Sequence, residues 1–211
     1  MRIESANFRL SEVNLALCAV ALILTAIPAS AQPRPTGRRD RIADQLRARI
    51  ESADASIGIT IGPERTMAHR SLPEFYSRRD YRPAWIGERA LLTQARRLSD
   101  SVRAASQHGL DPRDYHLQSI EALLDSTRGS GSGVDSVELL ELADLELLLT
   151  DAFLTLGSDL LVGRVDPRTF DATWPAESGR RADLPALLDQ AIASGRIEET
   201  LSALAPREPG Y

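Results

Sequence analysis

The stretch SVELLELADLELLLTDAFLTLGSDLLV, residues 136–162, decides the fold of this chain. It places Leu, Val or Phe on most faces of a helix that would be roughly 40 Å long at about 1.5 Å per residue. A helix that is apolar nearly all round is typical of the centre of a bundle. Acidic residues interrupt it too often for a membrane span: Glu138, Glu141, Asp144, Glu146, Asp151 and Asp159.

Shorter apolar stripes lie on both sides of this stretch. Their members recur every three or four residues, which predicts amphipathic helices within residues 42–50, 72–76, 91–105, 117–124, 184–192 and 197–204. An alternating run favours a strand at residues 56–61. The predicted fold class is therefore mainly α: a helical bundle-like scaffold with a long central helix and at most a short strand near residues 56–61.

Start and stop signals agree with these helices. Glycines that suit a left-handed helix end follow three of them: Gly109, Gly163 and Gly195. Asp followed by Pro suits a helix start, because Asp caps and Pro is shaped for the first position, and this pair occurs at Asp111-Pro112 and at Asp166-Pro167. Asp183 is placed to cap the helix at 184–192.

The N-terminus resembles a secretory signal peptide. Arg2 and Arg9 precede an apolar stretch from Leu15 to Ile27, and Ala29-Ser30-Ala31 follows it. This order predicts cleavage after Ala31 and export to the periplasm. An uncleaved anchor is the alternative, although the apolar stretch is shorter than the roughly 20 residues of a spanning helix.

The sequence predicts three further segments after the signal peptide. We expect residues 32–40, which are rich in Pro and Arg, to form a tether, with a cluster of arginines at Arg34, Arg38, Arg39 and Arg41 that is either solvated or touches an anionic surface. Residues 41–205 form the helical scaffold domain. Residues 206–211 contain two prolines and a glycine, and we expect them to begin a linker to a missing C-terminal region.

The single cysteine and the net charge exclude several function classes. Cys18 lies inside the signal peptide, and Leu17 before it is too large for a lipoprotein signal. After cleavage the chain would have no disulfide, no thiolate metal ligand and no cysteine nucleophile. The formal charge of -5 argues against a general nucleic-acid binder.

Few residues offer catalytic chemistry. The histidines are His69, His108 and His116, and Asp111 and Asp114 lie between the last two, but this spacing matches no metal-ligand motif. A pair such as Asp111 and Asp114 could cleave glycan, yet helix capping explains Asp111. Trp85 and Trp174 lie in non-helical stretches and either fill the core or stack on a sugar or partner. We predict no metal, no cofactor and no catalytic residue.

Three blocks of residues carry a family likeness over about residues 57–211. They are Leu72 to Trp85, His108 to His116, and Leu149 to Pro167. Together they resemble the helical scaffold domain of the large multidomain L,D-transpeptidases of Gram-negative bacteria. The positions that carry the resemblance, which we expect to be structural, are Phe75, Tyr76, Tyr81, Pro83, Trp85, His108, Gly109, Asp111, Pro112, Tyr115, Asp151, Gly163, Arg164, Asp166 and Pro167.

The resemblance implies a role in peptidoglycan cross-linking and cell wall biogenesis. In that family, peptidoglycan-binding and catalytic domains on the same chain follow the scaffold, and a Ser-His-Gly-Cys motif supplies the nucleophile. A thiolate attacks the stem peptide at diaminopimelate, releases D-alanine and passes the acyl group to a second stem. This sequence has no such motif, so only the scaffold role carries over. The alternative is a stand-alone periplasmic adaptor or peptidoglycan-binding module without enzymatic activity.

Overall fold

The computed structural model describes residues 37–54, 56–88, 90–127, 136–163 and 181–206. The elements in this part of the chain are α1 (Arg38–Ser52), β1 (Thr60–Ile61), β2 (Glu64–Arg65), α2 (Ser71–Arg78), α3 (Thr93–Arg103), the 3₁₀ helices η1 (Ala104–His108) and η2 (Pro112–Tyr115), α4 (Leu117–Ser126), α5 (Ser136–Val162), α6 (Leu184–Ser194) and α7 (Ile197–Leu204). The mainly α fold class is confirmed.

Several predictions fall on residues outside the described part. These are the signal peptide with Cys18, the tether up to residue 36, the family positions Arg164, Asp166 and Pro167, the tryptophan Trp174, and residues 207–211.

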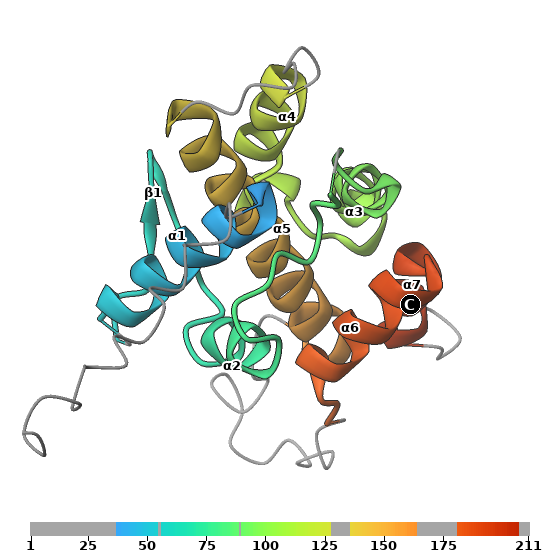
Figure 1. Cartoon of the computed structure of the whole chain (residues 1–211). Helices are drawn as coiled ribbons and strands as arrows, with labels where there is room; N and C mark the ends of the chain where they lie inside the picture. Colours follow the sequence, from blue (N-terminus) through green and yellow to red (C-terminus); the bar gives the residue numbers. More distant parts are fainter. Residues whose placement is uncertain (1–36, 55, 89, 128–135, 164–180, 207–211) are drawn as a thin grey trace, which may run out of the picture. The chain divides into compact units, whose positions relative to one another are not determined.

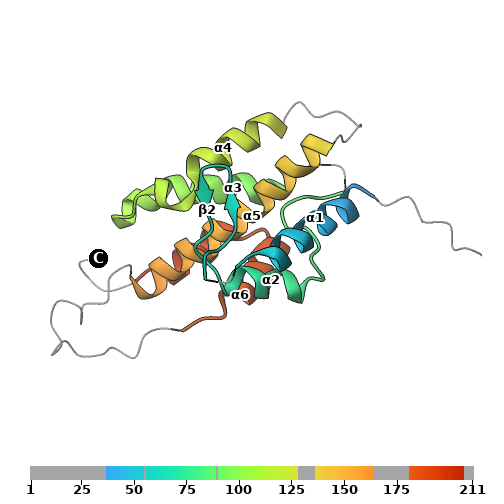
Figure 2. The ribbon, with the colours of Figure 1, turned by 90° about the vertical axis from the view of Figure 1, so that its left-hand side faces the viewer.

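Helix α5 is the central helix, with the bounds that its sequence predicts. Helices α1, α2, α3, α4, α6 and α7 all pack against it, and Figures 1 and 2 show them around it. Its buried positions run from Leu139 to Leu160 and lie on every face. No helix in the described part of the chain combines the length and apolar character needed to cross a bilayer.

Helix α1 begins earlier than the sequence indicates. Arg38, Arg39 and Asp40 belong to its first turn and not to a tether. The Asp40 carboxylate accepts the N–H of Gly37 at 3.1 Å, which satisfies a free backbone donor at the helix start. Arg38 donates to Glu138 at 3.1 Å and Arg39 to the Pro83 carbonyl at 3.0 Å. Both arginines therefore bind elements of the fold.

The predicted strand near residues 56–61 is shorter than expected. Strand β1 contains only Thr60 and Ile61, and it pairs with β2 in an antiparallel hairpin that the sequence did not indicate. Gly58 ends the alternation because its φ is +81°, and a Cβ there would lie 2.6 Å from the Thr66 carbonyl oxygen. The backbone therefore turns before residue 60.

The helix expected to start at Asp111 is divided in two. Asp111 does cap a helix start, since its carboxylate accepts the N–H of Arg113 at 3.0 Å. The element that follows is the 3₁₀ helix η2, and His116 then takes a left-handed φ of 61° before α4 begins. The contacts of His116, described below, explain this break.

Close packing at Gly157 lets α6 and α7 approach α5. A Cβ at this position would lie 3.2 Å from Cδ1 of Leu204 and 3.3 Å from Cδ2 of Leu184. We expect Gly157→Leu to lower the free energy of unfolding by about 2 kcal/mol, because overpacking forces neighbours apart. Gly157→Ala should cost far less, since the gain in helix propensity of roughly 1 kcal/mol offsets the crowding. Urea unfolding measures both, and equal stability of the Leu variant and the wild type would contradict this reading.

Candidate functional site

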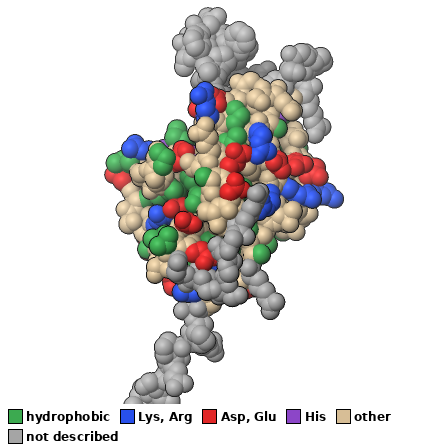
Figure 3. All heavy atoms as spheres, turned by 90° about the horizontal axis from the view of Figure 1, so that it is seen from above, with side chains coloured by type: hydrophobic (Ala, Val, Ile, Leu, Met, Phe, Trp, Pro, Cys, Tyr) green, Lys and Arg blue, Asp and Glu red, His purple; other side chains and the backbone are tan. Residues whose placement is uncertain are grey.

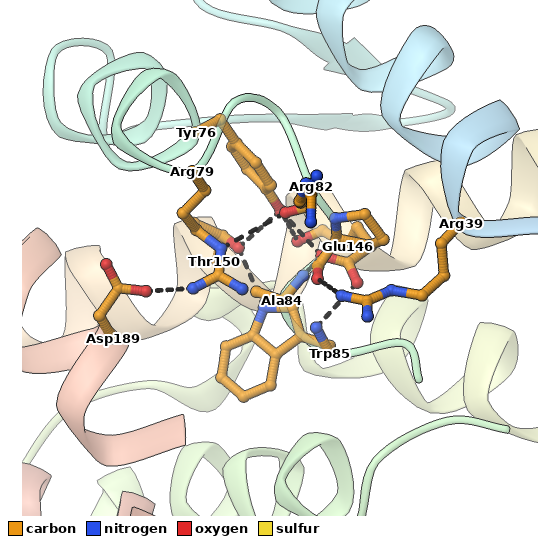
Figure 4. Close-up of polar contacts among 10 residues, drawn as sticks. Arg39, Tyr76, Arg79, Arg82, Ala84, Trp85, Glu146, Thr150 and Asp189 are labelled. Carbon is orange, nitrogen blue, oxygen red and sulfur yellow. Dashed lines mark hydrogen bonds and ion pairs between the residues drawn. The ribbon is translucent and has the colours of Figure 1, made fainter. Parts of the chain in front are cut away.

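Glu146 on α5 holds a non-helical segment of the chain. Its side chain is fully buried. Its carboxylate accepts the N–H groups of Ala84, Trp85 and Ile86 at 2.9, 2.8 and 2.9 Å, and Figure 4 shows part of this arrangement. Three successive backbone donors thus converge on one carboxylate, which ties residues 84–86 to the central helix.

Two aromatic side chains complete this first cluster (Figure 4). The Tyr76 hydroxyl donates to the carbonyl of Glu146 at 2.9 Å and lies 2.9 Å from the hydroxyl of Thr150. The indole N–H of Trp85 donates to the same Thr150 hydroxyl at 3.0 Å. Both rings are fully buried, so each polar end has a partner while the apolar body fills the core. Of the two roles that the sequence left open for Trp85, the structure therefore shows the first, a core residue.

Asp151, five positions further along α5, holds a second segment. It is also fully buried. Its carboxylate accepts the N–H of Met67 at 2.9 Å and that of Ala68 at 2.8 Å. The segment just after the β hairpin is therefore tied to α5 in the same way as residues 84–86.

His116 links this second cluster to the hairpin. Its Nε2 lies 2.8 Å from Asp151 Oδ2, and its Nδ1 lies 2.8 Å from Glu64 Oε2. Because both ring nitrogens face carboxylate oxygens, both can donate only in the imidazolium form. The Ser119 hydroxyl also donates to Glu64 at 2.7 Å. The left-handed backbone of His116 is the conformation in which its ring lies between these two acids.

The pKa values of these groups follow from burial and from their partners. Burial raises the pKa of Glu146 to about 7, against the hydrogen bonds from Ala84, Trp85 and Tyr76 that lower it. Burial lowers the pKa of His116, but its hydrogen bonds with Asp151 and Glu64 outweigh this, and the pKa is raised. For Glu64, burial raises the pKa, and the hydrogen bonds from Ser119 and His116 bring it below its ordinary value.

These shifts predict that the fold is most stable at mildly acidic pH. The folded pKa of Glu146 lies above its ordinary 4.5, so the folded state binds the extra proton and stability falls as the pH rises from about 4.5 to 7. The contribution of His116 is complete below its ordinary pKa of 6.5 and is lost as the pH rises through the raised folded value. The lowered pKa of Glu64 acts in the opposite sense, with stability lost only at acid pH.

Urea unfolding at pH 5, 6, 7 and 8 measures this dependence. We expect the wild type to lose up to about 3 kcal/mol over this range. In the Glu146→Gln variant, the decrease in stability below pH 7 should disappear. In the His116→Gln variant, the decrease at higher pH should disappear. A wild type that becomes more stable from pH 5 to pH 8 would show that neither group titrates as described.

The titratable side chains of both clusters are already engaged in hydrogen bonds within the fold. No group of three or more His, Cys, Asp or Glu residues among them is arranged to hold a metal ion. Both nitrogens of His116 already contact carboxylates, and Ser119 donates to Glu64 rather than to a base. His108 lies instead in a surface pocket between α3, η1, α5 and α7. Each of the two clusters fastens a non-helical segment to α5 through hydrogen bonds to a buried carboxylate.

The other family positions in the described part lie in the core or at backbone turns. Phe75 and Tyr76 pack edge to face with ring centroids 5.2 Å apart, and Pro83 is buried beside Trp85. Buried Tyr115 donates to Asp159 at 2.7 Å. Left-handed φ angles occur at Tyr81, Gly109 and Gly163. Pro112 begins η2 after the Asp111 cap.

Sequence reasoning missed the role of Glu146 and of Glu64. For Glu146 a signal existed, since it lies among the leucines Leu145, Leu147 and Leu148 in a helix that is apolar all round. A carboxylate in such a place is buried, and a buried carboxylate needs donors. Nothing in the sequence indicated that the donors would be three backbone N–H groups 60 to 62 residues away.

Charged side chains on the surface pair with one another. On the face seen in Figure 3, Asp or Glu and Arg side chains lie next to one another. The contacts of the described residues include pairs of this kind, such as Arg103 with Asp100 at 2.6 Å and with Glu121. Both signs of charge are therefore mixed, and the described residues of this face do not form the broad basic patch typical of nucleic-acid binding.

Comparison with known proteins gives one match. The scaffold domain family matches residues 70–211. Neither a curated protein nor a solved structure matches the chain. The matched range includes α2 to α7 and both acids, Glu146 and Asp151, that anchor the non-helical segments. Since the match covers more than half of the sequence, the chain belongs to the scaffold domain family.

Proposed function

We propose that this protein is the non-catalytic scaffold portion of an exported L,D-transpeptidase that cross-links peptidoglycan in the periplasm. The family match supports the scaffold role, and a scaffold domain implies further domains on the same chain. The finer assignment rests on the resemblance of three sequence blocks. Their residues meet at α5, where Tyr76 and Trp85 from the first block contact Thr150 of the third. His116 from the second block contacts Asp151 of the third.

This meeting of the blocks is the observation that carries the proposal. A scaffold must present its neighbours in a fixed geometry, and segments without regular structure are the weakest part of any helical body. Here buried carboxylates fasten two such segments to the central helix. Part of this rigidity therefore comes from residues that carry the resemblance, namely Trp85 and Asp151.

Muropeptide analysis in the source cell tests the proposal. Deletion of the gene should remove a measurable share of the cross-links between two diaminopimelate residues, while cross-links from D-alanine to diaminopimelate stay. Restoring the gene with Asp151→Ala should recover fewer of these links than restoring it with Asp144→Ala. Asp144 provides the control because it lies on the same helix but is partly exposed, where it contacts Arg49. Unchanged muropeptides after deletion would refute the proposed reaction.

A stand-alone adaptor is the second candidate. It is favoured by the self-contained hydrophobic core of the described residues, to which every helix from α1 to α7 contributes buried side chains. Binding of the purified protein to isolated sacculi or to a cell wall enzyme, combined with unchanged cross-links after deletion, would favour the adaptor over the transpeptidase scaffold.

A further inference from the structure

A surface pocket of about 260 Å³ lies where α7 packs against α3, η1 and α5. Its floor is apolar and is formed by Ala104, Ala105, Leu156, Leu160 and Leu201. Most of these side chains are almost fully buried in the fold, so the floor is fixed by the core. A preformed pocket that combines apolar side chains with placed polar groups is a common form of a binding site.

The rim of this pocket is polar and carries acids. It consists of Asp100, Ser101, Gln107, His108, Glu198 and Ser202. Asp100 already contacts Arg103 at 2.6 Å. Glu198 is exposed and forms no ion pair with a residue in the described ranges. The pocket therefore offers an open carboxylate above an apolar floor.

We propose that this pocket binds the side chain of a lysine on a partner protein. A lysine buries an apolar stem of four carbons and keeps its charged head at the surface. The stem would lie on the apolar floor of the pocket, and the ammonium would lie at its polar rim. The compact ammonium has three donors that turn freely, so it can bind the Glu198 carboxylate and a rim hydroxyl together. The 211 residues of the sequence contain no lysine, and we assign the occupant to a partner protein.

Titration of the 15N-labelled protein with Nα-acetyl-lysine-N-methylamide tests the proposal by NMR. We expect shifts confined to amides around the pocket and a dissociation constant on the order of 1 mM, which suits a ligand of this size. The norleucine analogue has the stem without the charge and should bind more weakly. The glutamate analogue should not bind.

Two variants provide a matched comparison. Glu198→Gln should weaken binding of the lysine probe roughly threefold, as expected for a partly exposed ion pair, and should leave the norleucine analogue unchanged. Glu199→Gln removes the same charge from the neighbouring exposed residue, which does not line the pocket, and should have no effect. Ser202→Phe should fill the pocket and abolish binding of both probes.

Three outcomes would overturn the proposal. They are shifts far from the pocket, equal affinity for the lysine and norleucine probes, and equal effects of the two Gln variants. Each of them leaves the transpeptidase proposal unaffected, because that proposal rests on the family positions around α5 and not on this pocket.

Discussion

Glu146→Leu is expected to destabilise the protein more than any other single substitution on α5. Leucine has a similar volume but accepts no hydrogen bond, so three buried N–H groups, those of residues 84–86, lose their partner. Each unsatisfied buried donor costs about 1–3 kcal/mol. A loss of roughly 4 kcal/mol or more follows, which is a large part of the 5–15 kcal/mol that typically stabilises a domain of this kind.

Thermal and urea unfolding, followed by circular dichroism, measure this loss. The matched control is Glu141→Leu on the same helix. Glu141 is only partly buried and accepts one hydrogen bond, from Ser126 at 3.2 Å, so its replacement should change stability by less than about 1 kcal/mol. If the two variants unfolded at the same urea concentration, Glu146 would not have the anchoring role described here.

Asp151→Ala is the second substitution with a large expected effect. It removes the acceptor of the Met67 and Ala68 N–H groups and one of the two carboxylates that face His116. Breaking a buried ionic cluster by removing one partner costs about 3–5 kcal/mol. Amide hydrogen exchange should show the change locally, with faster exchange at Met67 and Ala68 than at residues 84–86.

The effect of Asp151→Ala should depend on His116. In a His116→Ala background the same substitution leaves no charged imidazole behind, so it should cost less, by about 1–3 kcal/mol. Asp144→Ala is the control, since its contact with Arg49 is a partly exposed ion pair worth at most about 1 kcal/mol. Strict additivity of the His116 and Asp151 substitutions would show that the two side chains do not act as one unit.

The helices could be predicted because their signals are local. The bounds of α5, the Asp183 cap and the left-handed glycines Gly109, Gly163 and Gly195 all appear in the structure as expected. Each depends on residues within a few positions of one another, so spacing alone predicts it. The apolar stripe predicted within residues 91–105 is also buried, and it includes the small residues Ala95 and Ala105.

The polar clusters could not be predicted because their partners are far apart in the sequence. Ala84 is 62 residues from Glu146, and Met67 is 84 residues from Asp151. His116 could be recognised as unsuited to a known metal motif, but its position between Glu64 and Asp151 depends on how α4 and the hairpin pack against α5. The same tertiary contacts account for the left-handed break before α4.

The location of both anchors on α5 also has a consequence for synthesis on the ribosome. The anchored segments, at residues 67–68 and 84–86, are made before the acids that hold them. Domains generally fold as units once enough of the chain has emerged, and here completion requires the second half of the chain. Until Glu146 and Asp151 emerge, the N–H groups of residues 67–68 and 84–86 lack these acceptors. Synthesis of the central helix therefore sets the earliest point in translation at which this domain can complete its fold.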